Sequence, residues 1–390
     1  MRLAYIAQGK LSLITPEQPA RRIESRFAQD MIDRAIRRAE SKAWRAGGGS
    51  GMWGNANLWN VKQDFDPAAV KIRFSDVTVG SAENEILYCL QSERVSGLFR
   101  YALDEDRELR LFHKNDFQLC DIHRHPERET VIAALEHQNG ICNLIVFESD
   151  SPHYREVTTG DSRDEAPHWR RDKPEHIVYQ SAGVGRNSHG HFAGLGPMAI
   201  IDLDTRTGAL TPLVENDKAD CLQPRTTGNG DLYYLRRPYQ ADPWRQHALW
   251  NSLKDFVLFP FRLLRAFIDY LNVFSMIYSR KPLKTAGGPQ RPEEDISRTL
   301  LRGRVLNVQK ALERYRSADD APSLVPKNWE LVQRRPDGSE IVVAQGVSAF
   351  DVSADGGLCY TNGTGIFTRA PGSETERVGR DWLVEKVIAL

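Results

Sequence analysis

Residues Asp164–Ala182 of this chain, DEAPHWRRDKPEHIVYQSA, have the pattern of a short strand, a turn and a second strand. Alternating β-branched and aromatic residues predict a strand over Ile177–Ser181, and the charged residues Arg171–Pro174 predict the turn before it. Pairs of strand-like runs joined by polar turns recur along most of the chain. The sequence therefore predicts a fold built from repeated β-hairpin units.

The same stretch resembles the repeat of TolB-like β-propellers, which runs approximately A-x-P-x-W-S-x-D-G-x-x-I-x-Y-x-S. The matching positions are Ala166, Pro167, Trp169, Asp172, Ile177, Tyr179 and Ser181. Two positions depart from the pattern, since Arg170 replaces the usual serine and Lys173 the glycine. A shorter likeness lies at Ser353–Tyr360. The resemblance covers roughly residues 68–237 and 329–380. It implies a propeller that serves as a protein-binding platform more often than as an enzyme.

Strand spacing predicts how the repeats close. Strand-like runs occupy residues 70–237 and 329–390, and two more, Leu3–Ala7 and Leu11–Thr15, precede them. If Trp382–Leu390 pairs with Leu3–Ala7, six four-stranded units of about 43 residues result, within the ~40–45 residues of a propeller blade. That pairing leaves no open sheet edge at the seam. We predict an all-β, six-bladed propeller closed by its N- and C-terminal strands. Seven blades remain an alternative if residues 46–67 contain strands.

Two insertions divide the chain. The predicted parts are first-blade strands (1–25), a helix with a Gly-rich loop (26–67), blades two to the start of five (68–236), a helical, aromatic-rich insertion (237–328), and the remaining blades with the closing strand (329–390). In the first insertion, apolar residues at helical spacing predict a helix from about Phe27 to Arg45. The G-x-G-x-x-G at Gly49–Gly54 follows a helix and not a strand, so we interpret it as linker and not as a dinucleotide site.

The second insertion is much richer in aromatic residues than the blades. Charged residues interrupt every window of the ~20 apolar residues that a membrane span needs, which disfavours such a span. Two alternatives remain open. One is a helical subdomain that packs on a helix predicted at Asp295–Arg316, and the other is an amphipathic surface for a partner protein or a membrane interface. The candidate contact residues of that surface are Trp250, Phe256, Phe259, Phe267, Leu271 and Phe274.

Composition excludes several classes of protein. The 52 basic and 52 acidic residues balance, so the chain lacks the basic excess of a nucleic-acid-binding protein. Five scattered cysteines without a C-x-x-C pair argue against a disulfide framework or a zinc ribbon and fit a reducing compartment. The N-terminus lacks the apolar core and cleavage site of a signal peptide. We expect a cytoplasmic bacterial protein, with membrane association left open.

Four histidines and one aspartate are the candidate ligand-binding residues. Asp121, His123 and His125 alternate along one predicted strand and would share a face at the channel mouth, while His189 and His191 lie in the glycine-rich loop at 183–196. Polar inner strands and surface histidine pairs are common, so we predict no metal, no cofactor and no catalytic residue. No G-x-S-x-G, H-E-x-x-H or P-loop motif occurs.

Two functional hypotheses follow. The first is a non-enzymatic adaptor or scaffold that binds a protein partner, for example an AAA+ ATPase acting with a von Willebrand A protein. Its aromatic insertion would contact that partner or a membrane surface. The second is a hydrolase or lyase with its site at the channel mouth.

Overall fold

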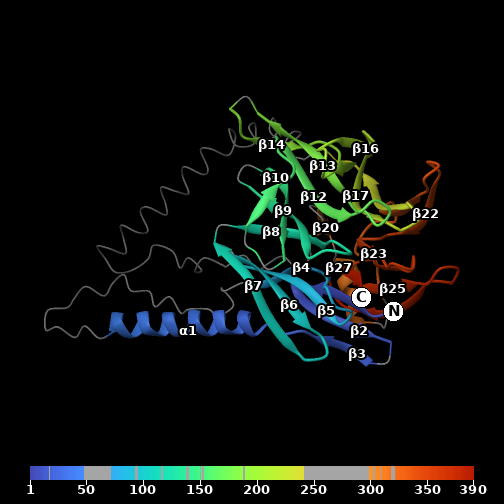
Figure 1. The fold of residues 1–390 in the computed structure, drawn as a ribbon. Helices are drawn as coiled ribbons and strands as arrows, with labels where there is room; N and C mark the ends of the chain where they lie inside the picture. Colours follow the sequence, from blue (N-terminus) through green and yellow to red (C-terminus); the bar gives the residue numbers. More distant parts are fainter. Residues whose placement is uncertain are drawn as a thin grey trace, which may run out of the picture.

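The computed structural model describes residues 1–16, 18–47, 72–92, 95–115, 117–137, 140–149, 151, 153–187, 189–240, 298–301, 304–307, 309–317 and 321–390. Within these residues the chain is mostly β, with strands gathered in several antiparallel sheets (Figure 1). The Gly-rich linker, the seventh-blade alternative at 46–67 and the six aromatic or aliphatic contact candidates from Trp250 to Phe274 lie wholly or almost wholly outside the described residues.

The first sheet combines both ends of the chain, and the N- and C-termini lie side by side (Figure 1). Its order is β27 (Val384–Ala389), β1 (Leu3–Ala7), β2 (Lys10–Thr15) and β3 (Gln18–Arg22). β1 and β27 are antiparallel, with Leu3 opposite Ala389. The predicted pairing of the two chain ends is therefore present. Every residue of β1 is buried, which explains its uniformly apolar sequence.

The other large sheets repeat a four-stranded pattern in chain order. One contains β4 (Arg73–Val79), β5 (Glu85–Gln91), β6 (Val95–Ala102) and β7 (Arg107–Asn115). Another contains β17 (Ala219–Thr226), β18 (Leu232–Pro238), β21 (Glu330–Arg334) and β22 (Glu340–Gln345). A third contains β23 (Ala349–Val352), β24 (Leu358–Thr361), β25 (Gly365–Arg369) and β26 (Glu376–Arg380).

Two further four-stranded groups form one nine-stranded sheet. The first group is β8 (Gln118–Arg124), β9 (Thr130–Glu136), β10 (Cys142–Glu148) and β11 (Tyr154–Glu156). The second is β12 (Ser162–Trp169), β13 (His176–Arg186), β15 (Ala199–Asp204) and β16 (Leu210–Val214). A single parallel pair, Cys142 with Arg163, joins them, and β14 (Phe192–Leu195) pairs with the far end of β13.

Six strands that begin these groups contact one another in sequence, and we call them the lead strands: β27, β4, β8, β12, β17 and β23. β4 contacts β8, β8 contacts β12, β12 contacts β17, β17 contacts β23, and β27 contacts both β23 and β4. Apolar side chains fill the space between neighbouring groups. For example, Ile132 and Leu144 pack with Trp169 and Tyr179 from the next group.

Helix α1 (Arg26–Gly47) follows β3 and agrees with the predicted helix to within two residues at each end. Ser25 caps it, because its Oγ accepts a hydrogen bond from the Ala28 N–H at 3.1 Å. Phe27 packs on Phe99 with ring centroids 5.0 Å apart. Only this N-terminal end lies against the sheets, and the rest of α1 extends away from them (Figure 1).

The helix predicted at Asp295–Arg316 is confirmed only at its C-terminal end and is wrong for residues 298–301 and 304–307. The described part of that stretch contains a hairpin of β19 (Arg298–Leu301) and β20 (Arg304–Asn307) followed by the short α3 (Gln309–Ser317). Short apolar runs such as Thr299–Leu301 fit a strand and a helix equally well by spacing. Two residues, Arg302 and Gly303, separate the two strands, which is the loop length of a tight β-hairpin. α3 packs through Tyr315 on Trp382, with ring centroids 5.3 Å apart.

Candidate functional site

Five of the six lead strands share a backbone irregularity that shapes the site. A β-bulge interrupts the pairing of β4, β8, β12, β17 and β27 with their neighbours. In three of them a non-glycine residue takes a positive φ, namely Asp121 (49°), Ala166 (50°) and Gln223 (53°). A bulge turns backbone N–H groups out of their own sheet, so they need acceptors elsewhere.

Side chains of preceding strands supply those acceptors. The carboxylate of Asp76 accepts from the N–H of Ile122, and that of Asp121 accepts from the N–H of Ala166 at 3.1 Å. The amide oxygen of Gln180 accepts from the N–H of Gln223 at 2.8 Å. The N–H groups that the bulges expose are therefore hydrogen-bonded to the side chains of Asp76, Asp121 and Gln180 on neighbouring strands.

The predicted ligand residues of β8 take part in this network. The Nδ1 atom of His123 accepts from the N–H of Trp169 at 3.2 Å. In His125, Nδ1 accepts from the N–H of Glu127 at 3.0 Å, so Nε2 carries the proton and donates to the carbonyl of Pro174 at 3.1 Å. Asp121, His123 and His125 all contact β12 or the turn after it. The structure brings the three side chains together between β8 and β12, where each forms a hydrogen bond with the backbone of β12 or of the turn after it.

His189 and His191 lie elsewhere. Both are exposed in the loop between β13 and β14, where their N–H groups donate to Asn187 Oδ1. Among the residues that the structure describes, no group of three His, Cys, Asp or Glu side chains is arranged to hold a metal ion.

A cavity of about 430 Å³ opens beside the bulges of β8, β12 and β17. Hairpin β13–β14 borders it, and the segment after β18 contributes Tyr239, whose hydroxyl donates to the carbonyl of Leu195 at 2.6 Å. Phe192 of β14 is 44% exposed and lies at this border. Its ring lies so close to Gly140 that a Cβ there would be 2.7 Å from it. The lining combines apolar and charged groups, including Asp121, Arg163, Glu165, Gln180, Met198, Leu222 and Arg237.

Glu165 is a largely buried carboxyl group of the cavity lining. Its oxygens accept from Arg163 Nε at 2.6 Å and from Gln180 Nε2 at 3.0 Å. Burial raises the pKa of Glu165 above its ordinary value, Arg163 lowers it in part, and Asp121 raises it further. A carboxyl with a raised pKa can hold a proton that an exposed one has lost.

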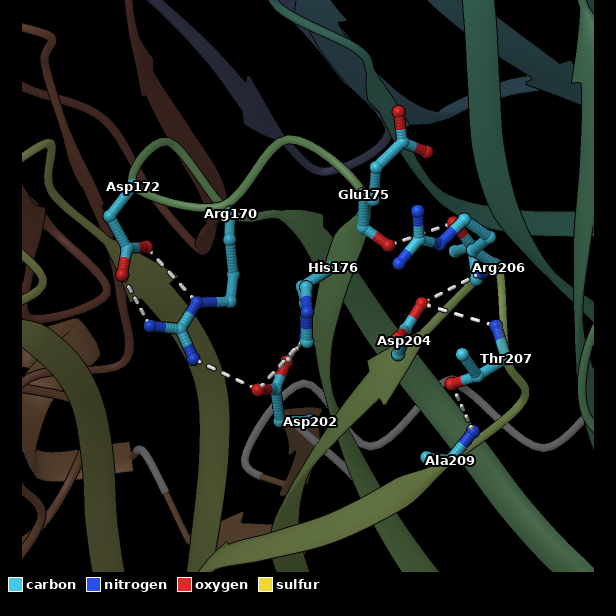
Figure 2. Close-up of polar contacts among 10 residues, drawn as sticks. Arg170, Asp172, Glu175, His176, Asp202, Asp204, Arg206, Thr207 and Ala209 are labelled. Carbon is cyan, nitrogen blue, oxygen red and sulfur yellow. Dashed lines mark hydrogen bonds and ion pairs between the residues drawn. The ribbon is translucent and has the colours of Figure 1, made fainter.

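The turn after β12 carries a second buried network (Figure 2). The guanidinium of Arg170 lies between two carboxylates, with Nε 3.0 Å from Asp172 Oδ1 and Nη1 3.0 Å from Asp202 Oδ2. The ring of His176 reaches the same Asp202 carboxylate at 3.2 Å. Arg170, the residue that replaces the serine of the TolB-like repeat, thus ties the turn to β15.

Sequence reasoning missed the cavity and most of its lining. The loop predicted at 183–196 contains the C-terminal part of β13 and strand β14, whose glycines masked the strand pattern. One signal was available. Pro167 and Pro224 each follow a positive-φ residue, and a proline within a central strand indicates a bulge because it cannot donate to the ladder.

Comparison with known proteins supports the fold. No family model matches this chain, and no curated protein matches it. The crystal structure of TolB from Acinetobacter baumannii is similar with a TM-score of 0.51 at 8% identity, covering 99% of this chain and 66% of that TolB. This chain has a TolB-like fold. It spans just under two thirds of that protein's length.

Two further structures are similar with lower scores. A putative TolB from Agrobacterium tumefaciens has a TM-score of 0.40 at 11% identity, over 80% of this chain and 82% of that one. A chain of a nidogen/laminin complex has a TM-score of 0.47 at 9% identity, over 99% and 97%. Among the described helices of the TolB-like chain, none has an apolar stretch of the length needed to cross a bilayer.

Proposed function

We propose that the chain is a six-bladed β-propeller that works as a non-enzymatic adaptor, and that the cavity beside β14 receives a segment of a protein partner. Six four-stranded groups and the cyclic contacts of the six lead strands support the blade number. The pairing of β1 with β27 supports a ring closed by the chain ends.

The observation that carries the binding role is the half-exposed Phe192 at the cavity border. An exposed aromatic side chain beside a concave surface is the usual anchor of a protein interface. Gln180 and Gln223, which are 7% and 5% exposed, line the same cavity and give it a polar interior. A cavity with an apolar border and polar groups in its interior fits an inserted peptide segment better than a flat apolar protein surface.

The test compares two residues of equal exposure. Phe192 and Ile341 are each 44% exposed, but Ile341 lies on β22, away from the cavity lining. We expect F192A to lose at least tenfold of the partner that a tagged copy retains in its native host, and I341A to retain it. A partner that binds F192A as well as the wild type would place the interface elsewhere.

The aromatic insertion supplies a second proposed contact, with the same partner or with a membrane surface, through Trp250, Phe256, Phe259, Phe267, Leu271 and Phe274. An AAA+ ATPase with a von Willebrand A protein remains the proposed class of partner, and the cytoplasm the proposed location. Both proposals rest on the sequence.

A hydrolase or lyase is the second candidate, because Glu165 and Asp121 line one cavity and burial raises the pKa of Glu165. Glu165, whose pKa is raised, could donate a proton as a general acid, and the carboxyl group of Asp121 in the same cavity could accept one as the base. Turnover of p-nitrophenyl glycosides or esters that E165Q abolishes and E136Q retains would favour this candidate. Glu136 is the matched control because it contacts the same Arg163, at 3.3 Å, from the surface.

A further inference from the structure

We propose that a second cavity, between the segment after β11 and the strands β12, β13 and β15, binds a primary ammonium group through the carboxylate of Asp164. The aliphatic chain of the ligand lies along the apolar part of the lining. The second cavity shares no lining residue with the cavity beside β14, and the proposal does not rest on the adaptor function.

The second cavity has a volume of about 440 Å³, and the register of the strands forms one side of it. Asp164 of β12 lies opposite Ser181 of β13, and Tyr179 of β13 lies opposite Ile201 of β15. Residues two apart on a strand point to the same side of a sheet, so these four side chains share one face. Residues 157–159, which follow β11, also line the cavity. It therefore lies between two neighbouring four-stranded groups.

The charges of the lining favour a cation. Asp164 and Glu215 both line the second cavity, and among the described residues no lysine, arginine or histidine does so. Asp164 is only 2% exposed, whereas Glu215 is exposed. A cavity lined by charges of one sign attracts ligands of the opposite sign.

Asp164 also differs from the other deeply buried acidic residues. Across the described part of the chain, these residues are Asp76, Asp164, Asp202 and Asp220. Asp76, Asp202 and Asp220 each form an ion pair with a lysine or an arginine. Asp164 has no such partner among the residues that the structure describes. Buried charges in proteins are normally paired, so a cation that enters the cavity would supply the missing counter-charge.

Hydroxyl groups orient the Asp164 carboxylate without neutralising it. Ser181 Oγ donates to Asp164 Oδ1 at 2.6 Å, and the hydroxyls of Thr158 and Ser162 also donate to this carboxylate. Thr158 Oγ1 accepts from the N–H of Leu144 at 2.9 Å, which leaves its proton for Asp164. Burial raises the pKa of Asp164, and the three hydroxyls lower it in part. A bound cation would favour the ionised form further.

The rest of the lining selects an ammonium group on an aliphatic chain. Ile201 and Pro212 line the cavity beside Asp164, and a lysine-like ligand buries its methylene groups along such a surface while its ammonium reaches a polar group. A guanidinium prefers both oxygens of a carboxylate at once, but Ser181 already donates to one of them. The described residues include no group of three His, Cys, Asp or Glu side chains that could hold a metal ion.

The first experiment measures binding of n-butylammonium chloride by titration calorimetry at constant ionic strength. We expect saturable binding to the wild-type chain and at least tenfold weaker binding to D164N, which keeps the shape of the side chain but removes its charge. Tetramethylammonium, which cannot donate hydrogen bonds, should bind at least tenfold more weakly than butylammonium. Without ligand, D164N should be as stable as the wild type or more stable, because an uncompensated buried charge is removed.

A pair of exposed residues provides the matched control. Glu215 and Asp217 are both exposed, but only Glu215 lines the second cavity. E215R and D217R change the net charge of the chain equally. We expect E215R to weaken butylammonium binding at least tenfold and D217R to leave it unchanged. This comparison holds even if D164N fails to fold, because neither substitution affects a buried side chain.

The second experiment distinguishes the source of the ammonium group. Acetyl-lysine N-methylamide, with a free side-chain amine, is titrated against the wild type and D164N. At least tenfold tighter binding than that of butylammonium would assign the site to a lysine side chain of a protein. Equal or weaker binding would assign it to free alkylammonium ions. The absence of saturable butylammonium binding to the wild type, or equal binding to E215R and D217R, would overturn the proposal.

Discussion

Lys386 of β27 and Asp76 of β4 form an ion pair in which the carboxylate is only 1% exposed. The other contacts of that carboxylate are the N–H groups of Val77 and Ile122. One buried group thus connects three lead strands, including the strand that pairs with the N-terminus. Burial raises the pKa of Asp76, and the Lys386 ammonium lowers it in part.

Removal of one partner from this pair should be severely destabilising. K386M leaves a buried carboxylate without a counter-charge, which costs about 3–5 kcal/mol. The double variant D76N/K386M should lose much less than the sum of the two single variants, as a urea-denaturation cycle would reveal. If the single costs simply add, the two residues do not interact in solution.

Deletion of residues 382–390 should expose the edge of the buried strand β1. We expect insoluble or loosely packed protein, because β1 would present unpaired backbone groups along an apolar strand. Solubility, near-UV circular dichroism and the thermal midpoint are the measurements. A soluble truncated chain with an unchanged midpoint would contradict a ring closed by β27.

Because His123 and His168 are buried, we expect the free energy of unfolding to decrease in acid. Burial, followed by the nearby arginines, lowers the pKa of His123 and His168 below 6.5 in the folded chain. As the pH falls below the unfolded value of about 6.5, the unfolded chain binds protons that the folded chain refuses, so the free energy of unfolding decreases.

H168Q should therefore lose less stability than the wild type between pH 7.5 and 5.5, by at most about 1.4 kcal/mol per pH unit. The comparison with the wild type is essential, because buried carboxyls with raised pKa values, such as Glu165, contribute the opposite slope. H189Q, at an exposed histidine, is the control. Parallel curves for H168Q and the wild type would mean that His168 titrates as an ordinary histidine.

Substitution of the insertion's apolar residues should separate binding from folding. We expect the triple variant of Phe267, Leu271 and Phe274 to serine to retain the wild-type thermal midpoint and to lose sedimentation with anionic liposomes or with the partner. A control triple variant replaces the exposed Leu109, Leu210 and Ile341 with serine and should retain both. Global unfolding of the insertion variant would identify these residues as ordinary core.

The sequence predicted the strands well because alternation is a local property. The strand at Leu3–Ala7 has the predicted bounds, and the strand predicted at Leu11–Thr15 begins one residue earlier. Even the distant partner of β1 followed from the spacing of the repeats. The cavity could not be predicted from the sequence. Its lining residues, such as Asp121, Gln180 and Arg237, come from different strands and meet through bulges.

Bulges are difficult to predict because they break the alternation that prediction uses. The strict period of two placed Asp121, His123 and His125 on one face, but a bulge interrupts β8 between Cys120 and His123. In the structure Asp121 and His123 accept hydrogen bonds from N–H groups of β12, and His125 donates to the carbonyl of Pro174.

The pairing of β1 with β27 also means that the first sheet cannot be completed until translation of the chain is almost finished. The hydrogen bond between Tyr5 and Asp381 joins residues 376 positions apart, so β1 leaves the ribosome long before its partner exists. Throughout that interval the nascent chain carries an apolar strand with one open edge. Synthesis that stops early would leave that edge exposed, which marks an aborted product for chaperones and proteases.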